Sequence, residues 1–330
     1  MTRHDVVVIG GSLAGAACVR ELTKQGIDAV ALERDRFPRA KVCGGFVSPG
    51  AVKCLDQLGV LDKVRAAGSV EVTSAKIRIG GREVEIVFDR PGIGISRTML
   101  DDVVARGANV LQGYAVRDVT VERRGFRVDE IECSAVIDAS GKLSRFTSRR
   151  PVEEFGVQYF GSETCGSVLE FAFFEDGYGG TISIEGGRSN SCFLIKKDAL
   201  PRYLNREDCL VTGPLAYERM PGEFIAIGDA AGMVDPFCGE GMRHALETGI
   251  LAARVVARGI RTGMAYPEMK REYDFSYKHE WATRKTLGAM IRRLVWRRRM
   301  FGCVLPATPP SLLNWFWNSS VGAVRGAQAR

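Results

Sequence analysis

The hydrophobic pattern at the start of the chain predicts a strand, a tight turn and a helix in succession. Val6–Ile9 is a short β-branched apolar run, Gly10–Gly15 supplies the turn, and Ala16–Gln25 favours a helix. Gly26 ends that helix, and a second apolar run, Ile27–Leu32, predicts the next strand. A strand, helix and strand in this order are typical of an α/β fold with a parallel sheet.

The glycine turn has the spacing of a dinucleotide-binding motif, with Ser12 in place of the second glycine. In such a motif Gly10 permits the turn, a small residue at position 12 lets a pyrophosphate approach the backbone, and Gly15 lets the helix pack closely on the strand. The phosphates then lie on the helix N-terminus, and Glu33 can accept the ribose hydroxyls. A glycine-rich turn of an unrelated α/β protein is the alternative interpretation. The cofactor-binding residues predicted here are Gly10, Ser12, Leu13, Ala14, Gly15, Glu33 and Arg34.

A second segment, more than 200 residues further on, favours FAD over NAD as the cofactor. Phe224–Ile227 predicts a buried strand, and after Gly228-Asp229 and a turn at 236–242 a helical pattern runs to about Ala257. This arrangement resembles the Gly-Asp motif of the para-hydroxybenzoate hydroxylase superfamily. The resemblance implies that Asp229 binds the ribityl chain and that helix amides lie beside the flavin, where they stabilise its reduced, negatively charged form. The residues implied are Gly228, Asp229, Pro236, Gly239, Glu240, Gly241 and Met242.

Two further segments are similar to parts of that superfamily. Residues 135–145 match the strand and turn that the superfamily places behind the pyrophosphate, and Arg97 matches its flavin-side arginine. A solvated surface arginine is the alternative for Arg97. The stretch from 97 to 111 is short for the superfamily, which predicts a truncated helix. The cofactor-binding residues implied here are Arg97, Ala115, Ala139, Ser140 and Gly141.

The segment 37–49 indicates a branch of the superfamily. It contains Phe37-Pro-Arg-Ala-Lys-Val-Cys43-Gly44-Gly45 and resembles an element of geranylgeranyl reductase family flavoproteins. The resemblance implies that Cys43, Gly44 and Gly45 border the flavin and the substrate cavity. Cys43 is therefore a candidate active-site thiol, or else a small packing residue. In the tunnel-lining motif of that family, Tyr178 and Asn190 are present while the Trp and the Phe-Pro pair are absent. Tyr178 is a second candidate catalytic residue.

Length and composition add three expectations. A chain of 330 residues is long enough for two lobes. Nine cysteines without paired spacing and three scattered histidines predict reduced thiols and no metal site, with His244 on a helix surface. Neither a signal peptide nor a membrane-spanning run is evident, which favours a cytoplasmic protein.

The net charge of +7 is concentrated after residue 257, where fourteen Lys or Arg accompany four Asp or Glu. Arg292–Phe301 and Leu312–Trp317 mix arginines with aromatic residues. One hypothesis is peripheral contact with the inner face of the membrane, and the alternative is a helical cap with its arginines in water. No recognition motif accompanies the charge, so nucleic-acid binding is not expected.

The pattern as a whole predicts an α/β fold, α+β overall. A Rossmann-like FAD-binding lobe would comprise residues 1–69, 94–155 and 214–262. A β-sheet substrate lobe would comprise 70–93 and 156–213, and a helical cap 263–330.

These resemblances imply an FAD-dependent oxidoreductase acting on a bulky hydrophobic substrate. No second glycine-rich motif is present, so NAD(P)H is expected to bind transiently as the reductant. A single-component monooxygenase that hydroxylates an aromatic or polyketide-like compound is favoured. One alternative is a geranylgeranyl reductase-like enzyme that reduces isoprenoid C=C bonds. The other is an electron-carrier or binding flavoprotein without substrate chemistry of its own.

Overall fold

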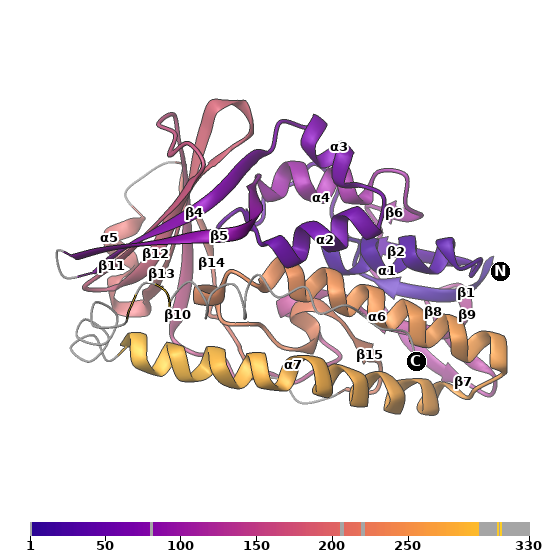
Figure 1. The fold of residues 1–330 in the computed structure, drawn as a ribbon. Helices are drawn as coiled ribbons and strands as arrows, with labels where there is room; N and C mark the ends of the chain where they lie inside the picture. The colour runs from indigo at the N-terminus through magenta and orange to yellow at the C-terminus, as the bar shows by residue number, and fades with distance from the viewer. Residues whose placement is uncertain are drawn as a thin grey trace.

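The computed structural model describes residues 2–79, 82–204, 208–218 and 222–296, together with 309 and 311. Within these residues the chain forms two β-sheets that lie side by side, with helices packed along the first sheet and beneath the junction between them (Figure 1). The predicted α/β class is confirmed.

The first sheet begins with the predicted strand and carries the glycine turn. Its strand order is β6-β2-β1-β9-β8-β7, and β15 pairs with the other edge of β9. The pairs among β6, β2, β1, β9 and β15 are parallel, whereas β7, β8 and β9 form an antiparallel meander. Val6, Val7 and Val8 are fully buried, as expected for a parallel strand covered on both faces. The strands are β1 (Thr2–Ile9), β2 (Ala29–Glu33), β6 (Val110–Gln112), β7 (Val119–Glu122), β8 (Gly125–Val128), β9 (Ile131–Asp138) and β15 (Ile225–Ala226).

The second sheet is longer and mostly antiparallel. Its strand order is β14-β10-β13-β12-β11-β4-β5-β3, with one parallel pair, β11 with β4. An aromatic and aliphatic cluster packs on this sheet and includes Phe46, Phe88, Tyr178 and Ile182. The strands are β3 (Phe46–Val47), β4 (Val70–Ile79), β5 (Arg82–Gly94), β10 (Glu154–Gly161), β11 (Val168–Phe174), β12 (Gly177–Ile184), β13 (Arg188–Lys196) and β14 (Leu210–Thr212).

Helices join the two sheets and cover the first. The α-helices are α1 (Leu13–Lys24), α2 (Pro49–Gln57), α3 (Leu61–Ala66), α4 (Arg97–Ala105), α5 (Leu200–Tyr203), α6 (Gly241–Thr262) and α7 (Tyr266–Trp296), with 3₁₀ turns η1 (Gly141–Leu143), η2 (Glu185–Gly187), η3 (Lys197–Ala199), η4 (Gly228–Ala231) and η5 (Pro236–Cys238). Helix α6 packs closely on α1 because Gly249 has no side chain: a Cβ there would lie 2.4 Å from the Ala14 carbonyl oxygen. Helix α7 runs alongside α6 (Figure 1). Its Tyr273 hydroxyl donates to the Ala226 carbonyl at 2.8 Å, which ties α7 to the first sheet.

The prediction that His244 lies on a helix surface is wrong. Its side chain is fully buried, with the ring edge-on to Trp281 at 4.5 Å between centroids and Nε2 3.3 Å from the Tyr277 hydroxyl. Burial lowers the pKa of His244 to about 3, so the ring is neutral. The pattern of α6 alone could not reveal this, because the cover comes from α7.

The C-terminal predictions fall mostly outside the described residues. The structure does not describe residues 297–330 apart from 309 and 311. The membrane hypothesis depends on the arginines and aromatic residues after Trp296, so it lies outside the described residues. Among the helices that the structure describes, none is long and apolar enough to cross a bilayer. The division of the chain into lobes and cap stays a prediction.

Candidate active site

The glycine turn brings β1 and α1 into the closest contact of this region. Gly10 has a φ of +106°, and a Cβ on Gly15 would lie 1.8 Å from the Gly10 carbonyl oxygen. The Gly11 N–H donates to Glu33 Oε2 at 2.8 Å, which fixes the carboxylate at the end of β2 against the turn. Only glycine fits at position 15, so the start of α1 can pack directly against the end of β1, as a dinucleotide-binding turn requires.

Arg97 and Asp101 form a buried ion pair at the start of α4, beside this turn. Arg97 Nε donates to Asp101 Oδ1 at 2.7 Å, and the Ser12 hydroxyl donates to Asp101 Oδ2 at the same distance while accepting from Arg97 Nη2 at 2.9 Å. Burial favours the neutral form of each side chain, but the attraction between their opposite charges and their hydrogen bonds has the larger effect. They raise the pKa of Arg97 and lower the pKa of Asp101. Arg97 is therefore not the solvated surface arginine of the alternative interpretation.

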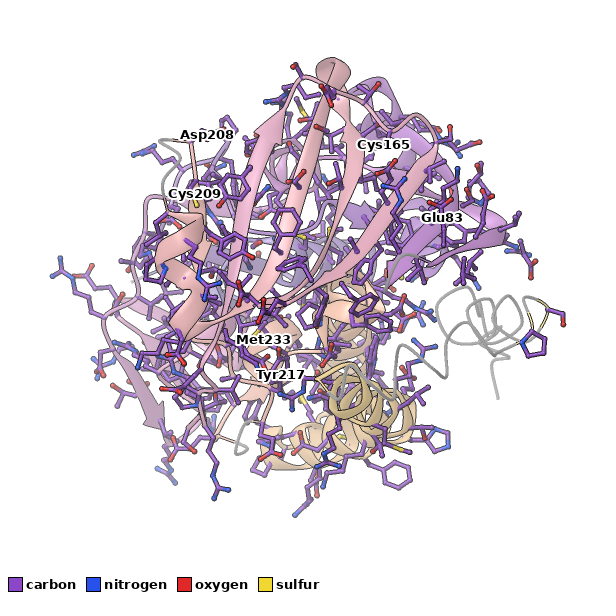
Figure 2. The ribbon with its side chains drawn as sticks, turned by 90° about the vertical axis from the view of Figure 1, so that its left-hand side faces the viewer. Glu83, Cys165, Asp208, Cys209, Tyr217 and Met233 are labelled. Carbon is purple, nitrogen blue, oxygen red and sulfur yellow. The ribbon has the colours of Figure 1, made fainter. Side chains whose placement is uncertain are left out.

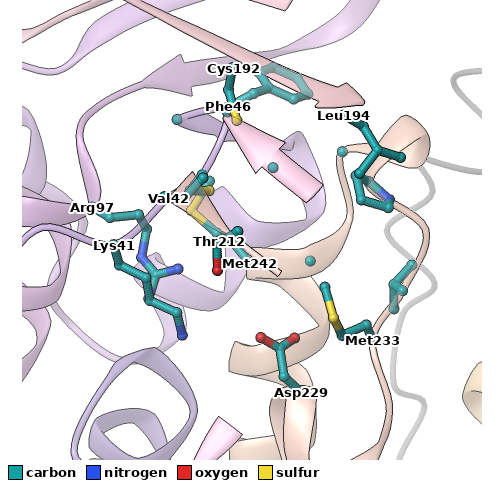
Figure 3. Close-up of a pocket in the computed structure, with 18 of the residues that line it drawn as sticks. Lys41, Val42, Phe46, Arg97, Cys192, Leu194, Thr212, Asp229, Met233 and Met242 are labelled. Atoms are coloured by element: carbon teal, nitrogen blue, oxygen red, sulfur yellow. The ribbon is translucent and has the colours of Figure 1, made fainter. Parts of the chain in front are cut away.

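Lys41 is a charged site residue that the sequence prediction missed. Its side chain lies next to Arg97 on one side of the cavity, and Asp229 projects into the cavity from η4 (Figure 3). Burial and the neighbouring Arg97 lower the pKa of Lys41, whereas Asp229 opposes that change. Because Asp101 balances the charge of Arg97, Lys41 and the backbone of the glycine turn are the features that suit this end of the cavity to an anionic ligand. The position of Lys41 two residues before Cys43 was the available signal.

The Cys43 turn is held by side chains of two strands of the second sheet. The Cys43 N–H donates to Gln158 Oε1 at 3.1 Å, and Asn190 Nδ2 donates to the Cys43 carbonyl at 2.9 Å. Gln158 Nε2 closes the ring by donating to Asn190 Oδ1 at 2.7 Å, and both amide side chains are buried. Gly45 is required beneath them, since a Cβ there would lie 2.7 Å from Asn190 Nδ2. This clamp of Gln158 and Asn190 fixes the backbone that carries the Cys43 thiol.

We expect Asn190→Ala to loosen the Cys43 turn, because it leaves the Cys43 carbonyl and the Gln158 amide without their partner. The variant should lose about 1–3 kcal/mol of unfolding free energy. Its Cys43 thiol should also be alkylated faster, which mass spectrometry of the labelled peptide measures. Ser191→Ala is the matched control: it removes a 2.8 Å hydrogen bond to Thr181 from the same strand without touching the turn. Equal Cys43 labelling in the two variants would contradict the role of the clamp.

The far end of the cavity is apolar and aromatic. Phe171, Tyr178 and Phe237 line it, and together with Phe173 they form a ring cluster with centroid separations of 5.3 to 6.0 Å. The buried Tyr178 hydroxyl donates to Asp235 Oδ1 at 3.2 Å. Burial and the Asp235 charge raise the pKa of Tyr178 well above its ordinary value, so this phenol is a poor proton donor.

One continuous cavity connects the glycine turn with this aromatic end. Met233 and Leu194 contribute to its wall on the side away from Arg97 (Figure 3). Of the predicted site residues, those that line the cavity are Ser12, Leu13, Ala14, Cys43, Gly44, Gly45, Arg97, Ala139, Gly141, Tyr178, Gly228, Asp229, Pro236, Gly239, Gly241 and Met242. Those outside its lining are Gly10, Gly15, Glu33, Arg34, Ala115, Ser140 and Glu240.

The residues at the turn fit the predicted FAD. Gly10 and Gly15 keep the β1–α1 turn free of side chains, Lys41 supplies positive charge for a pyrophosphate, and the Asp229 carboxylate can accept from ribityl hydroxyls. Arg34 is different: its side chain is exposed and pairs with Asp35 at 3.3 Å.

Residues 3–148 match the family model described as FAD binding domain. The chain is an FAD-dependent oxidoreductase. Among curated relatives of this oxidoreductase, menaquinone reductase of Mycolicibacterium smegmatis is 29% identical over 337 residues, covering 82% of this chain and 81% of the relative. Digeranylgeranylglycerophospholipid reductase 2 of Methanothermobacter thermautotrophicus is 28% identical over 343 residues, with coverage of 88% and 86%. Both matches extend well beyond the FAD-binding segment.

Solved structures share the fold of this oxidoreductase. A geranylgeranyl bacteriochlorophyll reductase-like protein from Thermoplasma acidophilum superposes with a TM-score of 0.74 at 19% identity, covering 100% of this chain and 94% of that one. A flavin-dependent brominase does so with a TM-score of 0.76 at 20% identity, covering 98% and 94%. At these identities the likeness shows the fold alone.

Proposed function

We propose that this oxidoreductase reduces C=C bonds in the prenyl chain of a lipid, with NAD(P)H as the reductant. The observation that carries the proposal is the continuity of the cavity: the lining passes from the charged glycine turn to an aromatic, aliphatic end without a partition. A prenyl chain matches such a wall by apolar contact alone. The names of the two curated relatives point in the same direction.

The chain's own residues have separable roles in this proposal. When bound and reduced by NAD(P)H, FAD would supply the hydride for reduction of the alkene, and the protein would have to supply the accompanying proton. Lys41 places positive charge beside the cofactor, which favours its anionic groups, and the Arg97–Asp101 pair holds the Ser12 side chain at the turn. Cys43 lies in the cavity lining, where the clamp holds its turn, and we infer that its thiol donates the proton. The Tyr178 ring forms part of the apolar wall, and its hydroxyl donates a hydrogen bond to Asp235.

Hydroxylation, which the sequence analysis favoured, remains testable against reduction. Reduction adds two hydrogen atoms to the substrate without oxygen, whereas hydroxylation requires O₂ and leaves one of its atoms in the product.

The deciding experiment incubates the FAD-loaded protein and NADPH with geranylgeranyl diphosphate or a prenylated quinone, once without oxygen and once under ¹⁸O₂. We expect a product heavier by two hydrogen atoms in both atmospheres and no ¹⁸O, detected by mass spectrometry. Incorporation of ¹⁸O would favour the monooxygenase. Cys43→Ser should slow the reaction while FAD content stays unchanged.

A further inference from the structure

A second pocket lies beside the aromatic end of the flavin cavity, and four cationic side chains line it. Arg149 and Arg150 come from the segment that follows η1 and its bend, whereas Lys285 and Arg292 come from α7. The carboxylates in its lining are Glu218 and Asp235. We refer to this as the basic pocket.

The basic pocket and the flavin cavity share a wall. Met233 lines both of them, and it lies close to Tyr217 of the basic pocket where the second sheet meets the helices (Figure 2). Asp235 joins the two spaces through its two oxygens: Oδ1 accepts from Tyr178 of the flavin cavity, and Oδ2 pairs with Arg292 Nε at 3.3 Å. The two spaces are therefore adjacent, and the Met233 and Asp235 side chains lie between them.

The charge of the basic pocket is not cancelled by its own lining. Arg292 is balanced by Asp235 and by Glu154, whose Oε1 is 3.6 Å away, and it stacks on Tyr217 at 4.1 Å from the ring centre. Arg149 instead donates to the Lys142 carbonyl at 2.9 Å, a neutral acceptor. Lys285 likewise donates to neutral acceptors, the Ala231 carbonyl and the Tyr277 hydroxyl. The four cationic side chains of the lining outnumber its two carboxylates, so the basic pocket carries a net positive charge.

We propose that the basic pocket binds a phosphate or diphosphate group, and that this group is the polar head of the prenyl substrate whose chain enters the flavin cavity past Met233. The inference rests on the proposed function and narrows it to phosphate-bearing prenyl lipids over neutral quinones. Guanidinium groups suit this task because their N–H pairs match phosphate oxygens in a bidentate geometry.

The first test is direct binding of inorganic pyrophosphate to the FAD-loaded protein by calorimetry. We expect Arg149→Gln/Arg150→Gln to weaken binding at least about tenfold, or about 1.4 kcal/mol. The matched control, Arg123→Gln/Arg124→Gln, removes the same charge from the exposed turn between β7 and β8 and should leave binding unchanged. No pyrophosphate binding by the wild type, or an equal loss in both variants, would overturn the pocket assignment.

The second test identifies the source of the phosphate. The arginine variant should lose affinity for geranylgeranyl diphosphate, keep its affinity for geranylgeraniol, and keep the KM for NADPH. A raised KM for NADPH with unchanged prenyl diphosphate affinity would assign the pocket to the dinucleotide and overturn the lipid assignment. Arginine-dependent binding of prenyl diphosphate without any reduction would support the pocket and contradict the proposed reductase, so the two failures are distinguishable.

Discussion

Gly15→Ala is expected to yield a protein that no longer retains FAD. The new Cβ would lie 1.8 Å from the Gly10 carbonyl oxygen, which is backbone and cannot rotate away. The start of α1 must then move from β1, and the amides at the turn lose the geometry that a pyrophosphate needs. Crowding of this kind also costs about 1–3 kcal/mol of stability. The measurement is flavin absorbance per mole of purified protein, with thermal unfolding of the apoprotein beside it.

Gly26→Ala separates crowding at the turn from the general cost of losing a glycine. Gly26 follows α1 with a φ of +75°, and a Cβ there would meet no atom within 4 Å. We expect this variant to lose about 1 kcal/mol of stability from backbone strain alone and to keep its flavin. If Gly15→Ala were purified with a full complement of FAD, the placement of the pyrophosphate at this turn would be wrong.

The turn could be predicted because its determinants are local. Strand, glycines, helix and Glu33 follow one another in sequence, and the contacts of Gly15 with Gly10 and of Gly11 with Glu33 lie within that unit, whereas Gly10 also packs on Ala139. The structure places the predicted strand and helix at β1 and α1 with shifts of only a few residues at their ends. Helix α4 likewise begins at Arg97, with a Ser96 cap whose hydroxyl accepts from Met99 N–H, and it is short as predicted.

The remaining features depend on contacts between segments far apart in the chain. Gln158 and Asn190 reach Cys43 across 115 and 147 positions. The motif that contains Asn190 does not reveal its contact with that turn, and no motif includes Gln158. The lowered pKa of Lys41 comes first from its burial in the folded protein and then from Arg97, which is far from it in the sequence. The basic pocket is assembled in the same way, from a bend and a helix that are more than 130 residues apart.

The role of Asp235 in the wall between the two cavities could not be predicted from the neighbouring sequence either. Asp235 precedes a proline and is readily interpreted as a turn residue, and its side chain does accept from the Phe237 N–H. Burial raises the pKa of Asp235 to about 6, while that hydrogen bond and Arg292 oppose the rise. The same carboxylate therefore caps a turn, holds Tyr178 and pairs with α7, and only the first of these three contacts is local.

The largest loss of stability is expected from Arg97→Ala. The Asp101 carboxylate is almost fully buried. Removal of the Arg97 guanidinium takes away its cationic partner and leaves it the hydrogen bond from the Ser12 hydroxyl. Breaking one side of a buried pair typically costs about 3–5 kcal/mol. Denaturant unfolding of the apoprotein measures this without interference from flavin. A double-mutant cycle with Asp101→Asn should recover part of the loss, because the amide carries no charge that needs a partner.

The same helix supplies the control for that cycle. Arg106 and Asp102 form an ion pair with the same four-residue spacing at the other end of α4, but the Arg106 side chain is 77% exposed. Arg106→Ala should cost no more than about 1 kcal/mol of unfolding free energy.

The stability lost in Arg97→Ala and the stability lost in Arg106→Ala should also differ in pH dependence. Arg97 lowers the pKa of Asp101 below its ordinary value of 3.8, so the pair stabilises the fold above that pH and its contribution disappears as pH falls. The gap between wild type and Arg97→Ala should therefore narrow as pH is lowered toward 3.8, since the buried carboxyl of the variant becomes neutral. A gap that stays constant over this range would mean that Arg97 stabilises the protein through packing and not through its charge.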